Sequence, residues 1–177
     1  MGSHFSSLFR TILVGVLFSF IAGCGYTQRV VLPYNIRTIA VTTFENKIPP
    51  QDQYTYRQGL EIELTNAIRD RLIFDGNLKV VEEAQADAVL KGAVISYKQE
   101  AVRFDDLESV EEYRLFLVVK FELVDQKTGK KLISEPNFSG RTEFFAQRNT
   151  PSNRGTSSND TVQDLARNIV DRIVEEW

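Results

Sequence analysis

Histidine and cysteine, which carry much of the acid–base and nucleophilic chemistry of enzymes, occur once each in this chain of 177 residues. They are His4 and Cys24, so the sequence after Cys24 contains neither an imidazole nor a thiol. Ser-His-Asp and Cys-His nucleophiles, histidine general bases and zinc sites built on cysteine or histidine are therefore excluded from that part of the chain. We expect a protein that is not an enzyme and that requires no metal and no cofactor.

Charged side chains are the remaining candidates for chemistry. Carboxylates cluster in residues 105–112, but a calcium loop would need a central glycine that this segment lacks, so we interpret it as a solvated turn. Cations are more informative, because the planar guanidinium group of arginine suits phosphate. A strand end and a polar segment supply the three candidate anion-binding residues, which are Arg103, Arg148 and Arg154. Each of them could equally be an ordinary solvated charge.

The N-terminal 24 residues have the composition of a secretory signal. Arg10 provides a positive charge, residues 11–21 are apolar, and small residues precede Cys24. The apolar run is too short to cross a bilayer, which takes roughly 20 residues. Ile21-Ala22-Gly23-Cys24 resembles the lipobox of bacterial lipoproteins. This resemblance implies that the chain is cleaved before Cys24 and that Cys24 is lipidated.

The lipobox divides the chain into three parts. We expect a signal peptide over residues 1–23, a lipidated tether over 24–35 and a single domain over 36–177. The tether has about ten residues of at most roughly 3.5 Å each, which keeps the domain within about 40 Å of the membrane. Gly25 stands where some bacteria use aspartate to retain a lipoprotein in the inner membrane, so we expect the outer membrane. The net charge of −3 argues against nucleic acid as a partner.

Residue periodicity after the tether predicts an α+β fold. Alternating β-branched and apolar residues predict five strands, over residues 37–44, 78–81, 88–104, 113–125 and 130–145. Apolar residues at helical spacing predict a helix over 54–74, followed by a glycine stop at Gly76. They predict a second helix that starts at Asn159 or Asp160 and whose apolar stripe runs to Trp177. The order is β-α-β-β-β-β-α. We expect two helices packed on one face of a mostly antiparallel four- to five-stranded sheet.

Several local features qualify this outline. Gly92 and Ala93 interrupt a strand with small side chains that would let another element approach closely. Pro136-Asn137 indicates a bulge or an edge position, and the polar segment 146–159 indicates a mobile loop. Four aromatic side chains could line a lipid groove but more often form the core of such a sheet. They are Phe116, Phe138, Phe144 and Phe145.

Three segments resemble the LPS-assembly lipoprotein family, the LptE-like lipoprotein subunit of the translocon that transports lipopolysaccharide. They are the lipobox with Cys24-Gly25-Tyr26, residues 36–41 (IRTIAV) followed by Phe44-Glu45-Asn46-Lys47, and residues 86–92 (ADAVLKG). The resemblance implies a non-enzymatic outer-membrane lipoprotein that sits as a plug inside a β-barrel lipopolysaccharide assembly protein and handles lipopolysaccharide. No family motif carries over to Arg103, Arg148 or Arg154, which remain candidates by position alone.

A second interpretation comes from envelope lipoproteins that activate a periplasmic cell-wall synthase or act as another periplasmic adaptor. They share the strand, the helix and an ADAVLKG-like segment, but they often carry a long tether after the lipidated cysteine. The short tether of this chain favours a partner in the outer membrane. The expected partners are therefore an outer-membrane β-barrel, lipopolysaccharide, and the membrane through the lipid anchor.

Overall fold

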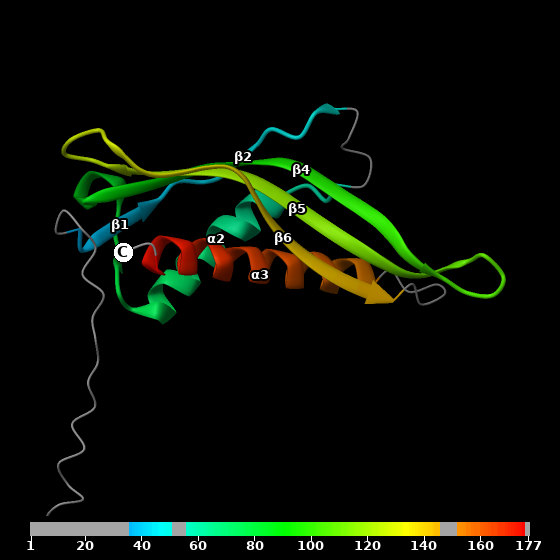
Figure 1. The fold of residues 1–177 in the computed structure, drawn as a ribbon. Coiled ribbons are helices and arrows are strands. Elements are labelled where there is room, and N and C mark those ends of the chain that lie inside the picture. Colours follow the sequence, from blue (N-terminus) through cyan, green and yellow to red (C-terminus); the bar gives the residue numbers. More distant parts are fainter. Residues whose placement is uncertain (1–35, 51–55, 146–151, 176–177) are drawn as a thin grey trace, which may run out of the picture.

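The computed structural model describes residues 36–50, 56–145 and 152–175. Its elements are β1 (Thr38–Val41), β2 (Glu45–Asn46), α2 (Leu60–Asp75), β3 (Lys79–Val80), the short 3₁₀ helix η3 (Glu83–Gln85), β4 (Ala88–Phe104), β5 (Val110–Asp125), β6 (Lys131–Phe145) and α3 (Ser152–Glu175). Both helices lie on one face of a single sheet (Figure 1). The predicted α+β fold is confirmed, and the described residues form a sheet of six strands instead of four or five.

The sheet combines three long antiparallel strands with three short parallel ones. The strand order is β3-β1-β4-β5-β6, and β2 also pairs with β4. β4 pairs with β5 and β5 with β6 in antiparallel fashion, whereas β1 and β2 run parallel to β4 and β3 runs parallel to β1. Because the long strands dominate, the prediction of a mostly antiparallel sheet holds.

The predicted strand 37–44 is shorter in the structure, where β1 covers only Thr38–Val41 and the separate strand β2 follows at Glu45–Asn46. The backbone N–H of Phe44 donates to Thr65 Oγ1 on α2 at 2.9 Å, which draws this residue out of a continuous ladder. The ring of Phe44 occupies the space above Gly92, where an added Cβ would lie 2.2 Å from the ring. The expectation that Gly92 allows a close approach is therefore confirmed.

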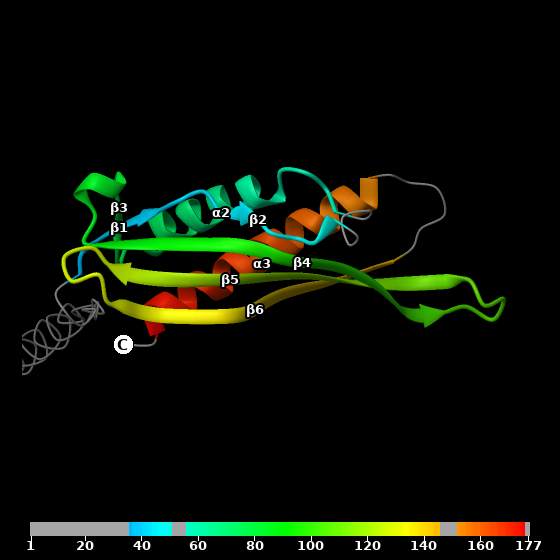
Figure 2. The ribbon, with the colours of Figure 1, turned by 90° about the horizontal axis from the view of Figure 1, so that it is seen from above.

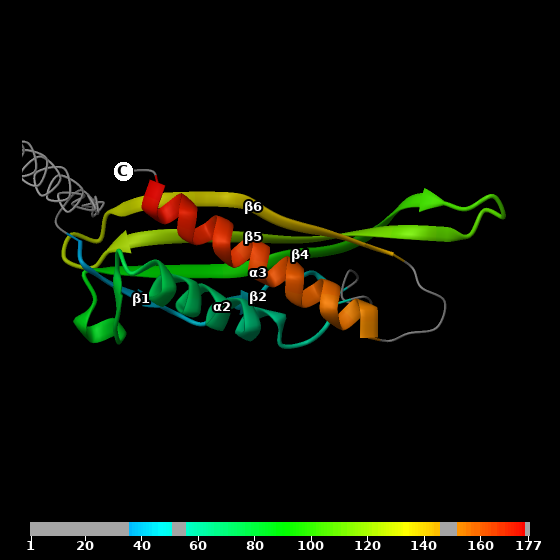
Figure 3. The same cartoon turned by 90° about the horizontal axis from the view of Figure 1, so that it is seen from below.

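The core lies between the sheet and the two helices, and it contains the predicted apolar stripes. β5 buries every second residue, namely Leu115, Leu117, Val119, Phe121 and Leu123. α3 crosses the same face of the sheet diagonally (Figure 3). It buries Val162, Leu165, Ala166, Ile169, Val170 and Ile173. α2 lies beside α3 and buries Leu60, Leu64, Ala67, Ile68 and Leu72. Trp177, which was predicted to continue the α3 stripe, falls outside the described residues.

Glycines set both ends of α2. The helix begins at Leu60 instead of at residue 54, because Gly59 has φ +93° and precedes it in a left-handed conformation. It ends at Asp75, where Gly76 has φ +75° and its N–H donates to the carbonyl of Leu72. This left-handed glycine is the helix stop that the sequence predicted.

α3 begins earlier than predicted. Residues 152–159 are helical, so the prediction of a loop to 159 and of a helix start at Asn159 or Asp160 is wrong. The first described turns bury polar side chains: Ser158 is 4% and Thr161 1% exposed, and Ser158 Oγ lies 3.2 Å from the hydroxyl of Tyr97. A buried face made of serine and threonine does not appear as an apolar stripe. Residues 146–151 of the predicted loop lie outside the described residues.

The β4–β5 hairpin extends past the end of the helices, and we call its outer part, residues 102–112, the arm (Figure 2). Its turn covers 105–109 only, because β5 already starts at Val110. The second hairpin, between β5 and β6, turns through Gly129 at φ +68°. In β6 the register shifts where the three residue steps from Glu135 to Phe138 face the two steps from Phe121 to Val119. The predicted bulge at Pro136-Asn137 is therefore confirmed.

Candidate functional site

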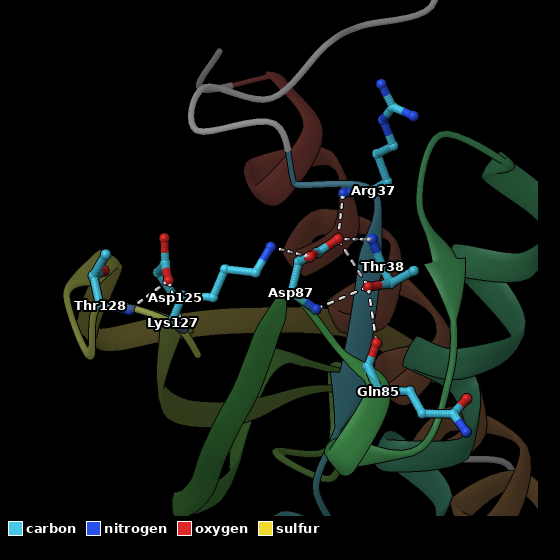
Figure 4. A network of polar contacts seen from close by, with 7 residues as sticks. All are labelled: Arg37, Thr38, Gln85, Asp87, Asp125, Lys127 and Thr128. Atoms are coloured by element: carbon cyan, nitrogen blue, oxygen red, sulfur yellow. Dashed lines mark hydrogen bonds and ion pairs between the residues drawn. The ribbon is translucent and has the colours of Figure 1, made fainter.

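Two of the three segments that carry the family resemblance, residues 36–41 and 86–92, meet at one carboxylate, Asp87 (Figure 4). Its Oδ2 accepts the backbone N–H groups of Arg37 and Thr38, each at 3.1 Å, and the Thr38 hydroxyl at 2.9 Å. The Lys127 ammonium donates to Oδ1 at 3.0 Å. The Lys127 hydrogen bond, followed by those from β1, holds the pKa of Asp87 well below its usual range. Asp87 therefore stays ionised and fastens the start of β1 to the sheet.

Asp125 has a similar structural role at the neighbouring hairpin. Its Oδ1 accepts the backbone N–H groups of Lys127 at 2.8 Å and Thr128 at 2.9 Å. The bond from Thr128 is the largest of the effects that lower the pKa of Asp125. Both carboxylates are thus occupied by donors that hold the backbone (Figure 4), and they do not form an acid–base pair.

Arg103, the first of the three candidate arginines, lies at the end of β4 within the arm. Its Nη2 is 2.7 Å from Glu112 Oε2, and its guanidinium group lies 5.7 Å from the centre of the Phe145 ring. Glu112 is only 8% exposed, so Arg103 neutralises a charge that would otherwise be buried without a partner. Arg103 therefore has a structural function.

The side chains of the other two candidate arginines, Arg148 and Arg154, lie outside the described part of the structure. Arg148 lies outside the described residues, and Arg154 belongs to α3 by its backbone while its side chain lies outside the described part. Cys24 also falls outside it. The roles of Arg148, Arg154 and Cys24 remain predictions.

The face of the sheet that points away from the helices carries cations that the sequence analysis did not select. Leu115 and Leu117 point to the helices, so Phe116 between them points to the opposite, outer face. Lys98 of β4 and Arg141 of β6 lie directly opposite Phe116 in the sheet register. The three form one row across three strands, which we call the Lys98–Phe116–Arg141 row, and the backbones of its two cations lie about 10 Å apart.

The two cations of this row are available for a ligand. Lys98 and Arg141 are exposed, and neither makes an ion pair with any residue in the described ranges. In the next row, by contrast, Arg114 is committed to Glu143, with Nη2 2.6 Å from the carboxylate. The half-buried ring of Phe116 adds an apolar surface between the two charges. This arrangement suits an amphiphile that carries phosphate groups and hydrocarbon.

A pocket of about 310 Å³ lies further along the outer face towards β2. Its cations are Lys47, Lys91 and Lys120. Lys47 lies 2.5 Å from Glu45 and, by hydrogen bonding and charge, lowers the pKa of that carboxyl group. Acidic and basic side chains alternate here, so the Lys98–Phe116–Arg141 row is the stronger cationic feature.

The four aromatic residues considered in the sequence have different environments. Phe138 packs on the core, with its ring 5.3 Å from and nearly perpendicular to that of Phe121, so the core prediction is correct for it. It is wrong for Phe145, which is 54% exposed, and Phe116 lies on the outer face. The side chain of Phe144 lies outside the described part.

Residues 36–50, 56–145 and 152–175 contain no group of three or more histidine, cysteine, aspartate or glutamate side chains able to hold a metal ion. None of the helices in those ranges combines the length and the apolar character needed to cross a bilayer.

Comparison with solved structures gives neighbours that share the fold at low sequence identity. A protein from Xanthomonas campestris aligns with a TM-score of 0.56 and 10% identity over 79% of this chain and 85% of its own. A minor lipoprotein from Acinetobacter baumannii aligns with a TM-score of 0.52 and 16% identity over 80% and 92%. An uncharacterized lipoprotein B from Nitrosomonas europaea aligns with a TM-score of 0.50 and 17% identity over 86% and 88%.

Comparison at the level of sequence identifies the family. No curated protein sequence matches this chain. The family model described as "LptE: Lipopolysaccharide-assembly" matches residues 36–176, which include every element of the fold. The chain therefore belongs to the LptE family of lipopolysaccharide-assembly proteins.

Proposed function

We propose that this protein is a lipid-anchored component of the outer membrane that forms a complex with a β-barrel translocon and assists lipopolysaccharide assembly without an enzymatic step. Membership of the LptE family supports the role in lipopolysaccharide assembly. The lipobox ending at Cys24 supports the lipid anchor, and the short tether supports a partner in the same membrane.

The outer face of the sheet is the feature that supports a direct contact with lipopolysaccharide. In the Lys98–Phe116–Arg141 row, two cations without an ion-pair partner among the described residues flank an aromatic ring. Ammonium and guanidinium groups bind phosphate, and the ring offers an apolar contact to an acyl chain or a sugar face. Arg148 and Arg154 remain additional candidates, and Arg103 is the weakest because it already pairs with Glu112.

The complex can be tested by purifying the tagged full-length protein from detergent-solubilised outer membranes. An outer-membrane β-barrel that co-purifies in stoichiometric amount would support the proposal. Recovery of a periplasmic cell-wall synthase in its place would contradict it and would favour an activator of that enzyme.

The lipopolysaccharide contact can be tested by charge reversal. We expect Lys98→Glu and Arg141→Glu each to weaken binding of purified lipopolysaccharide, and the loss to shrink at high salt, because exposed charge contacts are screened over about 8 Å at physiological ionic strength. Lys79→Glu is the matched control, since Lys79 is also an exposed lysine on a strand but lies on β3. Equal effects of the three changes would reject the row as the binding site.

The two arginines outside the described side chains need their own comparison. Arg148→Glu combined with Arg154→Glu should weaken the same binding if these residues contribute to it. Unchanged binding in this double variant, with weakened binding in Lys98→Glu, would assign the contact to the outer face alone.

A further inference from the structure

The arm concentrates exposed apolar side chains at one end of the molecule. Leu107 is 78% exposed, Phe104 58%, Phe145 54% and Val102 36%. Phe145 belongs to this group because the guanidinium group of Arg103 on the arm lies over its ring. Monomeric proteins seldom leave several large apolar side chains uncovered together, and such patches mark interaction sites.

The turn of the arm is held in a defined shape that presents Leu107. Asp105 Oδ1 accepts the backbone N–H of Leu107 at 2.9 Å and that of Ser109 at 2.8 Å. Glu108 has φ +59°, an unfavourable value for a residue with a side chain. The turn therefore keeps the leucine in solvent although the chain pays a conformational penalty there, which is a reason to look for a binding role.

The charge of the arm distinguishes between a lipid surface and a protein surface as the partner that covers these side chains. The arm contains five carboxylates and a single cation, Arg103, which is already paired with Glu112. The carboxylates are Asp105, Asp106, Glu108, Glu111 and Glu112. An anionic lipid surface or the phosphates of lipopolysaccharide would be repelled by this excess of negative charge. A protein surface that carries lysine or arginine around an apolar depression would be attracted.

The arm lies far from the end of the domain that begins at residue 36, where the predicted tether joins it. The arm lies opposite β1 and the C-terminal end of α3 (Figure 1). The sixteen residue steps of β4 place it roughly 50 Å from the Asp87 network, at about 3.3 Å per residue. The two ends of the molecule can therefore engage different surfaces at the same time.

We propose that the arm is a docking element for a protein partner, and that Leu107 and Phe104 enter an apolar depression bordered by lysine or arginine side chains. The partner is the β-barrel, so this inference rests on the proposed function and specifies which surface of this chain the barrel contacts. The acidic residues of the arm provide charge complementarity, and the Asp105 turn provides the preorganisation.

Site-specific photocrosslinking in cells tests this contact directly. A photoreactive phenylalanine analogue at position 107 of the full-length lipoprotein should crosslink to the barrel, and the crosslinked barrel peptide should contain apolar and basic residues. Position 74 is the control, because Phe74 is 81% exposed but lies at the end of α2. It should not reproduce that crosslink.

Two paired variants measure the energetic importance of the arm. Phe104→Ser with Leu107→Ser should weaken retention of the barrel at least tenfold, whereas Ile73→Ser with Phe74→Ser should leave it unchanged. Asp106→Lys with Glu108→Lys should also weaken it, while Asp105 is kept because it shapes the turn. Circular dichroism melting curves that match the wild type would show that these variants are folded.

The possible results separate the arm from the proposed function. Retention of the barrel without a crosslink from position 107 rejects the arm as the docking element and leaves the function standing. A crosslink from position 107 to lipopolysaccharide or phospholipid rejects a protein partner for the arm. Absence of any barrel from the wild-type preparation rejects both proposals.

Discussion

Replacing Asp87 by asparagine should loosen the junction between β1 and the rest of the sheet. The carboxylate accepts the backbone N–H groups of Arg37 and Thr38 and the Thr38 hydroxyl, together with the Lys127 ammonium. An asparagine oxygen can still accept some of these bonds, but the amide NH₂ then faces donors. Hydrogen bonds to a charged group contribute about 1.5–3 kcal/mol each, and partial exposure of Asp87 reduces that figure. We expect Asp87→Asn to lower the free energy of unfolding by about 2–3 kcal/mol at pH 7.

The loss should depend on pH with a defined sign. The folded-state pKa of Asp87 lies below that of an unfolded aspartate, which is about 3.9. Its stabilising contribution is therefore complete above about pH 5 and is lost as the pH falls through 4 towards the folded-state pKa. The difference between wild type and Asp87→Asn should shrink over that acidic range. Stability is measured by urea denaturation followed by far-UV circular dichroism.

Two variants provide the controls for this experiment. Asp70→Asn changes an exposed carboxylate of α2 that forms no ion pair among the described residues, and it should have little effect at any pH. Lys127→Ala should lower stability by less than about 1 kcal/mol, because the Lys127 side chain is 77% exposed. Equal losses for Asp87→Asn and Asp70→Asn at pH 7, or a pH-independent loss, would refute the assignment of Asp87 as the fastening residue.

Three further expectations concern packing and the anchor. Gly92→Ala should lower the free energy of unfolding by about 1–3 kcal/mol in denaturation experiments, because its Cβ would lie 2.2 Å from the Phe44 ring. Gly76→Ala should lower it by about 1 kcal/mol, because the Cβ would have open space around it but the φ of +75° is unfavourable for alanine. Ile169→Asp should lower the free energy of unfolding by about 4 kcal/mol, because Ile169 is fully buried. Asp171→Ala should lower it by at most about 1 kcal/mol, because it removes only a partly exposed ion pair with Arg71. Similar denaturation midpoints for the two variants would mean that α3 is not docked on the sheet. Cys24→Ser should release the protein from the membrane fraction, and mass spectrometry that finds a processed but unmodified Cys24 in the wild type would contradict lipidation.

Local patterns in the sequence were sufficient where the structure follows local rules. β4 runs from Ala88 to Phe104 as predicted, because alternating side chains and flanking polar residues define its limits. α2 ends at Asp75, one residue past the predicted Phe74, and the left-handed Gly76 that follows it is the predicted local stop signal. The start of α3 was missed because its early turns bury the polar residues Ser158 and Thr161, and Ser158 contacts Tyr97, which is far away in the sequence.

The candidate site depends even more on contacts between residues that are distant in the sequence. Arg103 was selected by its position at a strand end, but its pairing with Glu112 depends on how β4 and β5 align. Lys98 and Arg141 were not selected, because they become neighbours of Phe116 only through the register of three strands. That register includes shifts near Ile95 and Pro136, and a one-residue shift moves a side chain to the other face.

We expect Pro136 to limit self-association of the protein through β6. β6 is the last strand of the sheet, and its free side could pair with a second copy of the chain along Lys131–Phe145. Proline has no backbone N–H, and the bulge beside it interrupts the regular spacing of donors and acceptors. An incoming strand would therefore lose its alignment near the middle of β6, and the sheet is protected against growing from molecule to molecule into a fibre.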